Sequence, residues 1–530
     1  MSMNRFFALS AILATLSGCQ SMTSGTWSAD YNSTATGNPA AMRYGTYRSI
    51  NDMDTRRVAV LLPLSGTNAD LGREIRAGVE MAALSAGADN LSVSFHDTGA
   101  NPGSAINAAL YTNPEVIIGP VFADQARALR NAKSSELPVL SFTSDATAIG
   151  DGIMTMALMP SNSIEAIIRE IRADNSRGVV VIAPDTTSGH LMAGIAKRAT
   201  EIYGVPTTGI FFYKEKDTNS IKSATSAASM NTARTAANNR AREILSDILT
   251  NEQISGPERQ SIARQLENLA REETLGPLPY DAVLFLGTGD DSKSAASFMR
   301  YFGVSARDAT FYGTAMWDGA DLESDFTMTG AKFASLPPVN PQFANLYEMT
   351  TGHAPSRIAG FGYDATNMAL GMMYSQNGAA AYLLNPSGYA GTDGVMRLRP
   401  TGDSERALRI MRLDGSGTAK EVRSAPTNFL TPLYNVDQRT VSPAYAQPLA
   451  TPGVNPSNYI QIPERLRGKY RSQTYGANMA AVAAATLPTQ SVVTIQPTED
   501  DTVILTSPDF QPQKIETVQR TYIDSVEIEE

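Results

Sequence analysis

Short, continuously apolar runs that alternate with stretches of helical period constrain the fold of this chain more than any other feature. Such runs occupy residues 58–62, 116–118, 139–142, 178–183 and 282–286. A strand that is buried on both faces of a parallel sheet has this composition, because neither face meets water. Strands that alternate with helices predict parallel sheets joined by right-handed crossovers. We therefore expect an α/β fold.

The runs and the helical stretches between them fall into two series, which predicts two lobes. Residues 75–83 follow the first run and place apolar side chains at helical spacing, so together they form the first strand and helix unit. The second series begins at residue 178 and continues with short strands at 210–213 and 310–312. Residues 360–373 have helical spacing, and we expect this helix to return to the first lobe.

The folded domain is expected to span residues 56–417, and two of its features depart from the regular alternation. Residues 214–279 interrupt the second series and contain two amphipathic helical stretches, with Pro257 suited to the first turn of a helix. This insertion is interpreted either as decoration packed on its own lobe or as a surface for a partner. Near the end of the domain, residues 395–399 and 408–413 flank a turn and predict a hairpin.

Both ends of the chain are expected to lack a packed core. Residues 19–55 are rich in Ser, Thr, Gly and Asn without an apolar period, which predicts a flexible tether. Residues 418–530 contain recurrent prolines and then a stretch rich in Thr, Gln and Ala. Such a composition buries too little apolar surface to fold, so we expect a largely disordered tail.

The N-terminus has the pattern of an export signal. An apolar run over residues 6–16 has the length of a signal-peptide core and is too short to span a bilayer. It ends in Leu16-Ser17-Gly18-Cys19, which resembles the lipobox of bacterial lipoproteins, whose cysteine accepts a diacylglycerol and becomes the mature N-terminus. Residues 1–18 are therefore expected to be a lipoprotein signal peptide.

Cys19 is the only cysteine of the chain, so it has neither a disulfide partner nor a companion for a cysteine-based metal site. The alternative is that its position after the apolar run is incidental. Gln20 follows where enteric lipoproteins that stay in the inner membrane carry Asp, so the resemblance implies a lipid anchor in the outer membrane, facing the periplasm.

The charge of the chain argues against nucleic acid as a partner. The formal net charge is -10 and there is no run rich in Lys or Arg, so the positive surface that phosphate backbones require is missing. The content of hydrophobic residues, 42%, is sufficient for a sizeable core.

Catalytic motifs are absent from the sequence, which favours a protein that is not an enzyme. There is no G-x-S-x-G elbow, phosphate-binding loop, H-E-x-x-H helix or cysteine pair, and the three histidines lie far apart. No metal or cofactor is implied. Paired acids at residues 290–291 and 318–325 leave glycoside hydrolysis open, which needs two carboxyl groups about 5–9 Å apart.

Four segments together resemble the Leu/Ile/Val-binding-protein-like group of type I periplasmic binding proteins. They are residues 58–78, residues 97–110, residues 117–120 together with 138–147, and residues 361–370. With their spacing they extend the resemblance over residues 56–415. The resemblance implies a two-lobed α/β fold in which each lobe is a mostly parallel sheet flanked by helices, with the helical insertion in the second lobe.

Within that superfamily the chain is most similar to the lipoprotein activators of penicillin-binding proteins, the LpoA/LppC group. The phrase Leu61-Leu62-Pro63-Leu64-Ser65-Gly66, the Asp97-Thr98 turn and the long insertion carry this resemblance. It implies a regulator of peptidoglycan synthesis that binds and activates a class A penicillin-binding protein. The alternative is a solute-binding lipoprotein of an ABC transporter for amino acids or another polar small molecule.

The resemblance also implies that a set of polar and aromatic side chains faces a cleft between the lobes, where a small molecule could bind. These candidates are Ser65, Ser141, Thr143, Ser144, Thr147, Ser188, Thr314, Trp317 and Tyr363. The competing interpretation is that Ser and Thr at the ends of strands serve turns and helix caps.

By the same resemblance, the two positions that hold a bound amino acid carry the wrong residues. The hydroxyl that meets the ligand carboxylate falls near Phe122-Ala123, and the acid that meets the ligand ammonium falls near Ala315, with Asp318 and Asp321 as possible substitutes. A charged group removed from water needs an opposite charge or several hydrogen bonds. Loss of amino-acid binding is therefore expected.

Overall fold

The computed structural model describes residues 55–88, 90–376, 378–429 and 453–476, and in addition the strands β1 (Met42–Tyr44), β17 (Thr494–Gln496) and β18 (Ile504–Thr506). The expected signal peptide and Cys19, the expected lipid acceptor, lie outside the described residues, as does most of the stretch expected to form a disordered tail. Among the described residues, no helix is long and apolar enough to cross a membrane.

Lobe 1 contains a six-stranded sheet in the order β1-β3-β2-β4-β5-β6. Its parallel strands are β2 (Arg56–Leu62), β3 (Leu91–Asp97), β4 (Val116–Ile118), β5 (Val139–Ser141) and β6 (Ile153–Thr155), and β1 pairs with β3 in the antiparallel direction. The flanking helices are α2 (Ala69–Ala86), α3 (Pro102–Tyr111), α4 (Ala123–Ala132) and α12 (Arg357–Tyr374).

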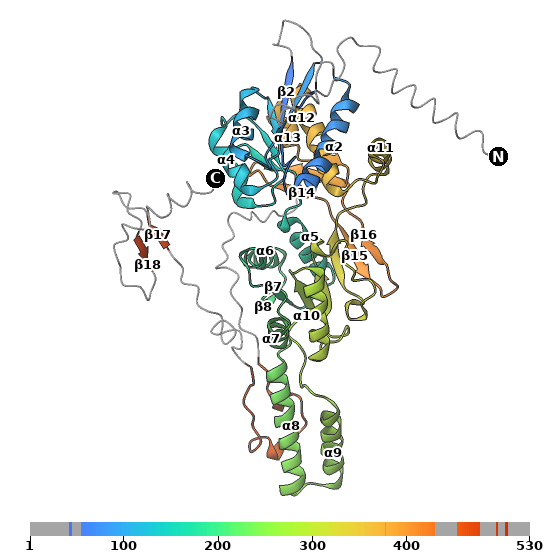
Figure 1. The fold of residues 1–530 in the computed structure, drawn as a ribbon. Helices are drawn as coiled ribbons and strands as arrows, with labels where there is room; N and C mark the ends of the chain where they lie inside the picture. Colours follow the sequence, from blue (N-terminus) through green and yellow to red (C-terminus); the bar gives the residue numbers. More distant parts are fainter. Residues whose placement is uncertain are drawn as a thin grey trace, which may run out of the picture.

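The pleat of strand β2 decides which helices cover each face of this sheet. Val58 and Val60 pack in one core cluster with residues of α2 and α12, whereas Ala59 and Leu61 pack in another with residues of α3 and α4. Successive side chains of a strand point to opposite faces, so a continuously apolar strand requires a helical layer on both sides. Helix α12 thus returns to lobe 1, as predicted (Figure 1).

Lobe 2 contains a seven-stranded sheet in the order β16-β15-β11-β10-β9-β7-β8. The parallel strands are β7 (Val179–Pro184), β8 (Thr207–Tyr213), β9 (Ala282–Phe285), β10 (Thr310–Gly313) and β11 (Lys332–Ser335), and the antiparallel strands are β15 (Arg409–Leu413) and β16 (Ala419–Arg423). Helices α5 (Pro160–Ala173) and α6 (Thr187–Tyr203) cover one face, and α7 (Thr218–Ala228) and α10 (Gly289–Tyr301) cover the other. The two-lobed α/β fold is confirmed.

The chain crosses between the lobes three times, at residues 156–159, 336–340 and 407–408. After the second crossing, α11 (Pro341–Thr351), α12 and α13 (Ala379–Leu383) precede a small antiparallel sheet of β12 (Tyr389–Gly391), β13 (Gly394–Leu398) and β14 (Ser404–Arg406). The predicted hairpin of residues 395–399 with 408–413 was wrong. Strand β13 pairs with β14 instead, and β15 joins the sheet of lobe 2 after the third crossing.

The insertion divides into two parts. Helix α7 packs in the core of lobe 2, as the decoration interpretation expects, whereas α8 (Asn231–Asn251) and α9 (Gly256–Arg271) extend away from lobe 1 as an arm (Figure 1). Ser255 and Glu258 form a capping box that starts α9, with Pro257 in its first turn.

Residues 453–476 complete the arm, although the sequence placed them in a disordered tail. Val454, Ile460, Ile462 and Tyr470 share a core cluster with the apolar stripes of α8 and α9, and each is at most 7% exposed. The sequence could not predict this contact, because prolines interrupt every local pattern here and the partner helices lie about 200 residues earlier. We call α8, α9 and residues 453–476 the arm module.

Candidate functional site: the cleft between the lobes

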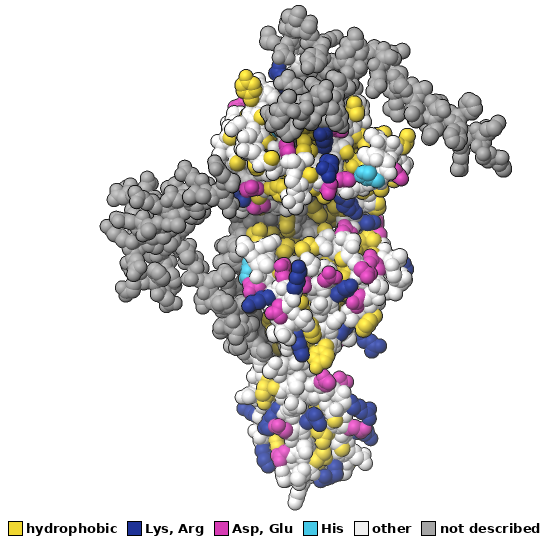
Figure 2. Space-filling model, viewed as in Figure 1, with side chains coloured by type: hydrophobic (Ala, Val, Ile, Leu, Met, Phe, Trp, Pro, Cys, Tyr) yellow, Lys and Arg dark blue, Asp and Glu magenta, His cyan; other side chains and the backbone are white. Residues whose placement is uncertain are grey.

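The carboxyl ends of the parallel strands in both lobes face the groove between them. Strand β6 ends at Thr155 and β11 at Ser335, and the chain enters the other lobe directly after each. All strands parallel to these two end on the same side, which is where α/β sheets bind ligands. Figure 2 shows the surface hollowed between the two lobes, with hydrophobic side chains in the hollow.

Asp97 organises the rim of lobe 1. Its Oδ1 accepts hydrogen bonds from the backbone N–H groups of Leu64 (2.8 Å), Ser65 (3.2 Å) and Gly99 (2.7 Å), and so joins the loops after β2 and β3. A side chain at Gly99 would place its Cβ 2.2 Å from the carbonyl oxygen of Ser65, so only glycine fits here. Ser65 is half-buried and lies in the loop that follows the carboxyl end of β2.

The candidates after β5 divide between buried and exposed side chains. Ser141 is fully buried and its Oγ donates to the carbonyl of Pro120 (2.8 Å), while the Oγ1 of Thr143, also buried, accepts from the backbone of Asp145 (3.2 Å). These hydroxyls serve the turn, as the competing interpretation holds. Ser144 is exposed, and Thr147 is exposed with its hydroxyl 2.7 Å from Asp145 Oδ1.

The candidates after β10 lie in the core of lobe 2 rather than in the groove. Thr314 is buried, and its Oγ1 accepts from the backbone N–H of Met316 (3.3 Å). Trp317 is 1% exposed, and its Nε1 donates to Ser292 Oγ (3.0 Å). The indole lies against the backbone at Gly313, where a Cβ would come within 2.2 Å of the ring. The aromatic residue that sequence placed at a ligand is therefore a packing residue.

At the end of β7, Ser188 is exposed, and its neighbour His190 makes the more specific contact. The Nε2 of His190 lies 2.8 Å from Asp185 Oδ1, and its ring stacks on Phe212 with 4.0 Å between centroids. Thr186 caps the N-terminus of α6, because its Oγ1 accepts a hydrogen bond from the backbone N–H of Gly189 (3.0 Å). The spacing of the histidines in the sequence did not identify Asp185 as the partner of His190.

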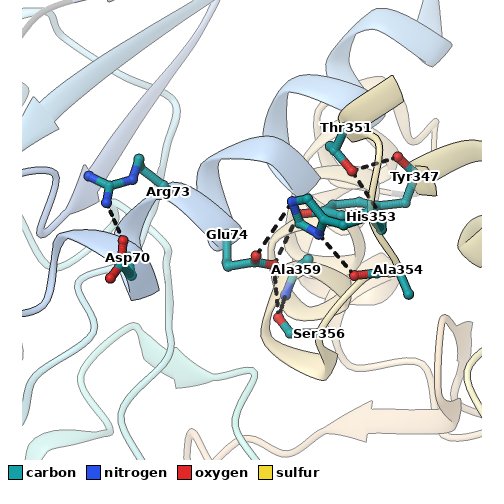
Figure 3. Close-up of polar contacts among 9 residues, drawn as sticks. All are labelled: Asp70, Arg73, Glu74, Tyr347, Thr351, His353, Ala354, Ser356 and Ala359. Atoms are coloured by element: carbon teal, nitrogen blue, oxygen red, sulfur yellow. Dashed lines mark hydrogen bonds and ion pairs between the residues drawn. The ribbon is translucent and has the colours of Figure 1, made fainter. Parts of the chain in front are cut away.

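Tyr363 belongs to the side of lobe 1 where α2 meets α11. Its ring lies 4.9 Å from that of Phe343. Beside it, Glu74 of α2 accepts hydrogen bonds from Tyr347 Oη (3.0 Å) and Ser356 Oγ (3.0 Å), with His353 Nε2 4.0 Å from the carboxylate (Figure 3). The cluster fastens α11 and the start of α12 to α2, and Ser356 does not contact His353 as a nucleophile would contact its base.

The acids considered as substitutes near Ala315 are both engaged within the protein. Asp318 accepts from Ser335 Oγ (2.8 Å) at the second crossing, and Asp321 accepts from Ser324 Oγ (3.1 Å). Both side chains are exposed, so these bonds fasten the loop after β10 without removing the carboxylates from solvent. In the part of the chain that the structure describes, no group of three or more His, Cys, Asp or Glu residues is placed to hold a metal ion.

The periplasmic binding protein family matches residues 55–378, which is more than half of the chain. The chain belongs to the periplasmic binding protein family. Membership implies a periplasmic location and places the chain among binding proteins. A search of the curated proteins found no match.

Solved structures of such binding proteins share the fold at low sequence identity. A putative branched-chain amino acid ABC transporter protein from Rhodospirillum rubrum is 16% identical, with 69% of this chain and 100% of that chain covered and a TM-score of 0.51. The C-domain of LpoA from Haemophilus influenzae, described as a regulator of PBP1A, is 15% identical, with 69% of this chain and 99% of that chain covered and a TM-score of 0.47. At this identity the likeness shows the fold alone.

The first and third crossings of this binding protein are joined by a buried polar network that we call the hinge network. Arg406 at the third crossing pairs with Asp393 (Nη1 to Oδ1, 2.6 Å), donates to the carbonyl of Met156 at the first crossing and covers the ring of Phe361. Ser404 Oγ also donates to Ala157 O (2.7 Å). The spacing of residues in sequence did not reveal this network.

Asp364 adds a titratable group to the hinge network. Its carboxylate accepts from the backbone N–H and the hydroxyl of Thr392, each at 3.0 Å, and it is 1% exposed. Burial raises the pKa of Asp364 to about 7, against the lowering effect of the Thr392 hydrogen bonds and Arg406.

Lowering the pH from about 8 to about 5 is expected to stabilise the fold through Asp364. Its folded pKa, about 7, lies above the unfolded value of about 4, so between these values the folded state binds a proton that the unfolded state does not. The contribution of Asp364 to the free energy of unfolding therefore falls as the pH rises from about 4 to about 7.

Urea unfolding of the wild type and of Asp364→Asn across this pH range measures the effect, because the carboxamide does not titrate. The free energy of unfolding of the wild type should fall relative to the variant by about 2.7 kcal/mol as the pH rises from about 5 to about 8. A difference that stays constant with pH would contradict the assignment.

Proposed function

We propose that this binding protein is an envelope lipoprotein, anchored to the outer membrane through Cys19, that binds and activates a class A penicillin-binding protein without catalysing a reaction itself. The proposal starts from the resemblance of residues 61–66, Asp97-Thr98 and the insertion to the LpoA/LppC group. The observation that carries it furthest is the arm module, which gives a binding protein a second, projecting surface.

The arm module is held by contacts between segments far apart in the sequence. Arg465 donates both terminal nitrogens to the Glu258 carboxylate (2.6 and 3.0 Å), and Tyr470 Oη donates to Glu252 (2.9 Å). Gln265 and Gln461 exchange two hydrogen bonds between side chain and backbone. A surface that is ordered before binding loses less conformational entropy on docking, which suits a contact with another protein.

The burial of several candidate ligand contacts in the cleft also supports this proposal. Ser141, Thr143, Thr314 and Trp317 are buried, and Asp318 is bonded to Ser335. Four of the nine candidate residues are therefore not available to a ligand, and a charged ligand that meets too few polar partners is costly to remove from water. The protein partner is thus favoured over a free amino acid.

Replacing residues 235–274 by a short Gly/Ser loop is expected to abolish stimulation of the cognate synthase while both lobes still fold. A short loop is sufficient to join Arg234 to Leu275, because the N–H of Leu275 lies 3.0 Å from the carbonyl of Arg234. Helix α7 is kept because it packs in the core of lobe 2. The measurement is the rate of glycan polymerisation and crosslinking by the synthase with each version added, alongside thermal melting.

A matched pair of charge reversals sharpens the test. Arg264 of α9 and Arg172 of α5 are both exposed helix residues, and neither side chain has a hydrogen bond or ion pair within the described residues. Arg264→Glu should weaken stimulation and Arg172→Glu should not, since interfaces favour Arg. Full stimulation by the shortened protein would place the contact elsewhere.

The second candidate function is solute binding for an ABC transporter, which the family and the open groove favour. Ser65, Ser188 and the Asp185–His190 pair offer polar groups at its rim. Isothermal titration of the protein with leucine, isoleucine and valine separates the two functions. Our proposal expects no dissociation constant tighter than about millimolar, whereas a micromolar value would favour transport.

A further inference from the structure

A hollow of about 520 Å³ lies where the arm module joins lobe 2, distant from the cleft. Its walls come from α7, α8, the end of α9 and the end of α10. Figure 1 shows α8 and α9 leaving lobe 2 here, and Figure 2 shows hydrophobic and charged side chains together at this junction. The volume falls within the range of small-molecule sites, about 300–1,000 Å³.

One face of α8 supplies the polar wall. Asn231, Thr235, Asn239 and Arg242 are spaced by four, four and three residues, so they form one stripe along the helix. Within the described residues, none of these four side chains has a hydrogen bond or ion pair to the rest of the protein. They therefore present amide, hydroxyl and guanidinium groups that remain open to a ligand.

An aromatic ring forms the opposite wall. Tyr301, the last residue of α10, is 69% exposed, and Lys222 Nζ lies 5.6 Å from the centre of its ring. The ring of the adjacent Phe302 meets it edge to face at 5.1 Å and is buried, which supports its orientation. An exposed tyrosine offers an apolar face and a polar tip to the same ligand.

The charges around the hollow decide which class of ligand it fits. Lys222 and Arg242 are balanced by Glu272 and Glu273, so there is no excess charge to attract an anion or a cation. Amide and hydroxyl groups facing an aromatic ring instead match a neutral molecule that carries many hydroxyl groups and has an apolar face. Sugars have this chemistry.

We propose that this hollow binds a neutral oligosaccharide, whose hydroxyl and amide groups are hydrogen bonded by the stripe on α8 and whose ring face packs on Tyr301. The inference goes beyond the proposed function and does not depend on it. If the proposed function also holds, the synthase and the glycan that it polymerises contact neighbouring parts of the same arm module.

The test is isothermal titration of the full-length protein with the tetramer of N-acetylglucosamine as the probe. We expect binding in the range of about 0.1 to a few millimolar, and a loss of at least about fivefold in affinity for Tyr301→Ala. Tyr111→Ala is the matched control, because Tyr111 is 93% exposed at the end of α3 in lobe 1. It should leave the affinity unchanged.

Three results would overturn the proposal. These are no heat of binding at about 10 mM probe, equal affinity of wild type and Tyr301→Ala, and tighter binding of a sulfated tetramer than of the neutral one. Thermal melting of Tyr301→Ala checks its folding, which the exposed position should preserve. Synthase stimulation is measured separately on Tyr301→Ala. Because sugar binding and stimulation are separate readouts, failure of the sugar proposal can be distinguished from failure of the proposed function.

Discussion

The substitution Asp393→Ala is expected to lower the free energy of unfolding by about 3–5 kcal/mol, because it leaves the buried guanidinium of Arg406 without its partner. Both side chains are 2% exposed, and their contact is 2.6 Å long. Arg406 also joins the third crossing to the first through the Met156 carbonyl, so its displacement disturbs both lobes. Urea unfolding followed by circular dichroism provides the measurement.

Lys420→Ala is the control for this prediction. Lys420 pairs with Asp414 at the surface with its side chain 66% exposed, and such a pair contributes at most about 1 kcal/mol. If Asp393→Ala destabilised the protein no more than Lys420→Ala does, Arg406 would have to reach water or another partner in the variant. The hinge network would then not hold the crossings together.

Deleting residues 453–476 is expected to unfold the arm module while both lobes stay folded. The deletion removes four buried apolar side chains, Val454, Ile460, Ile462 and Tyr470, each of which contributes about 1.5–3 kcal/mol. It also removes the pairing of Arg465 with Glu258. Amide hydrogen exchange in α8 and α9 should accelerate by at least about 100-fold, with the strands of lobe 1 unchanged.

A chain that ends at residue 476 is the matched control. This truncation removes none of the contacts described between the arm helices and residues 453–476, so protection of α8 and α9 should persist. Unchanged exchange after deletion of residues 453–476 would mean that the two helices are stable alone, and the ordered surface invoked for partner binding would not depend on the C-terminal segment.

The sequence by itself determined the layers of both lobes. Val58 to Leu62 is apolar at every position, and such a strand is stable only between two helical layers, so strand, sheet type and crossover follow from local composition. The local sequence also determined the two helices of the arm module. Apolar residues of α8 and α9 recur at helical spacing, and Ser255, Pro257 and Glu258 mark where α9 begins.

Tertiary structure decided which side chains remain available and which distant segments meet. A strand-end Ser, Thr or Trp has the same sequence pattern whether it faces a ligand or its own core, and only packing buried Trp317 and left Ser188 exposed. Residues 409–413 pair with lobe 2 because the chain crosses directly after Arg406, and residues 453–476 fold because α8 and α9 bury their apolar side chains. Contacts between segments this far apart depend on surfaces that neither segment carries alone, so no local pattern in the sequence encodes them.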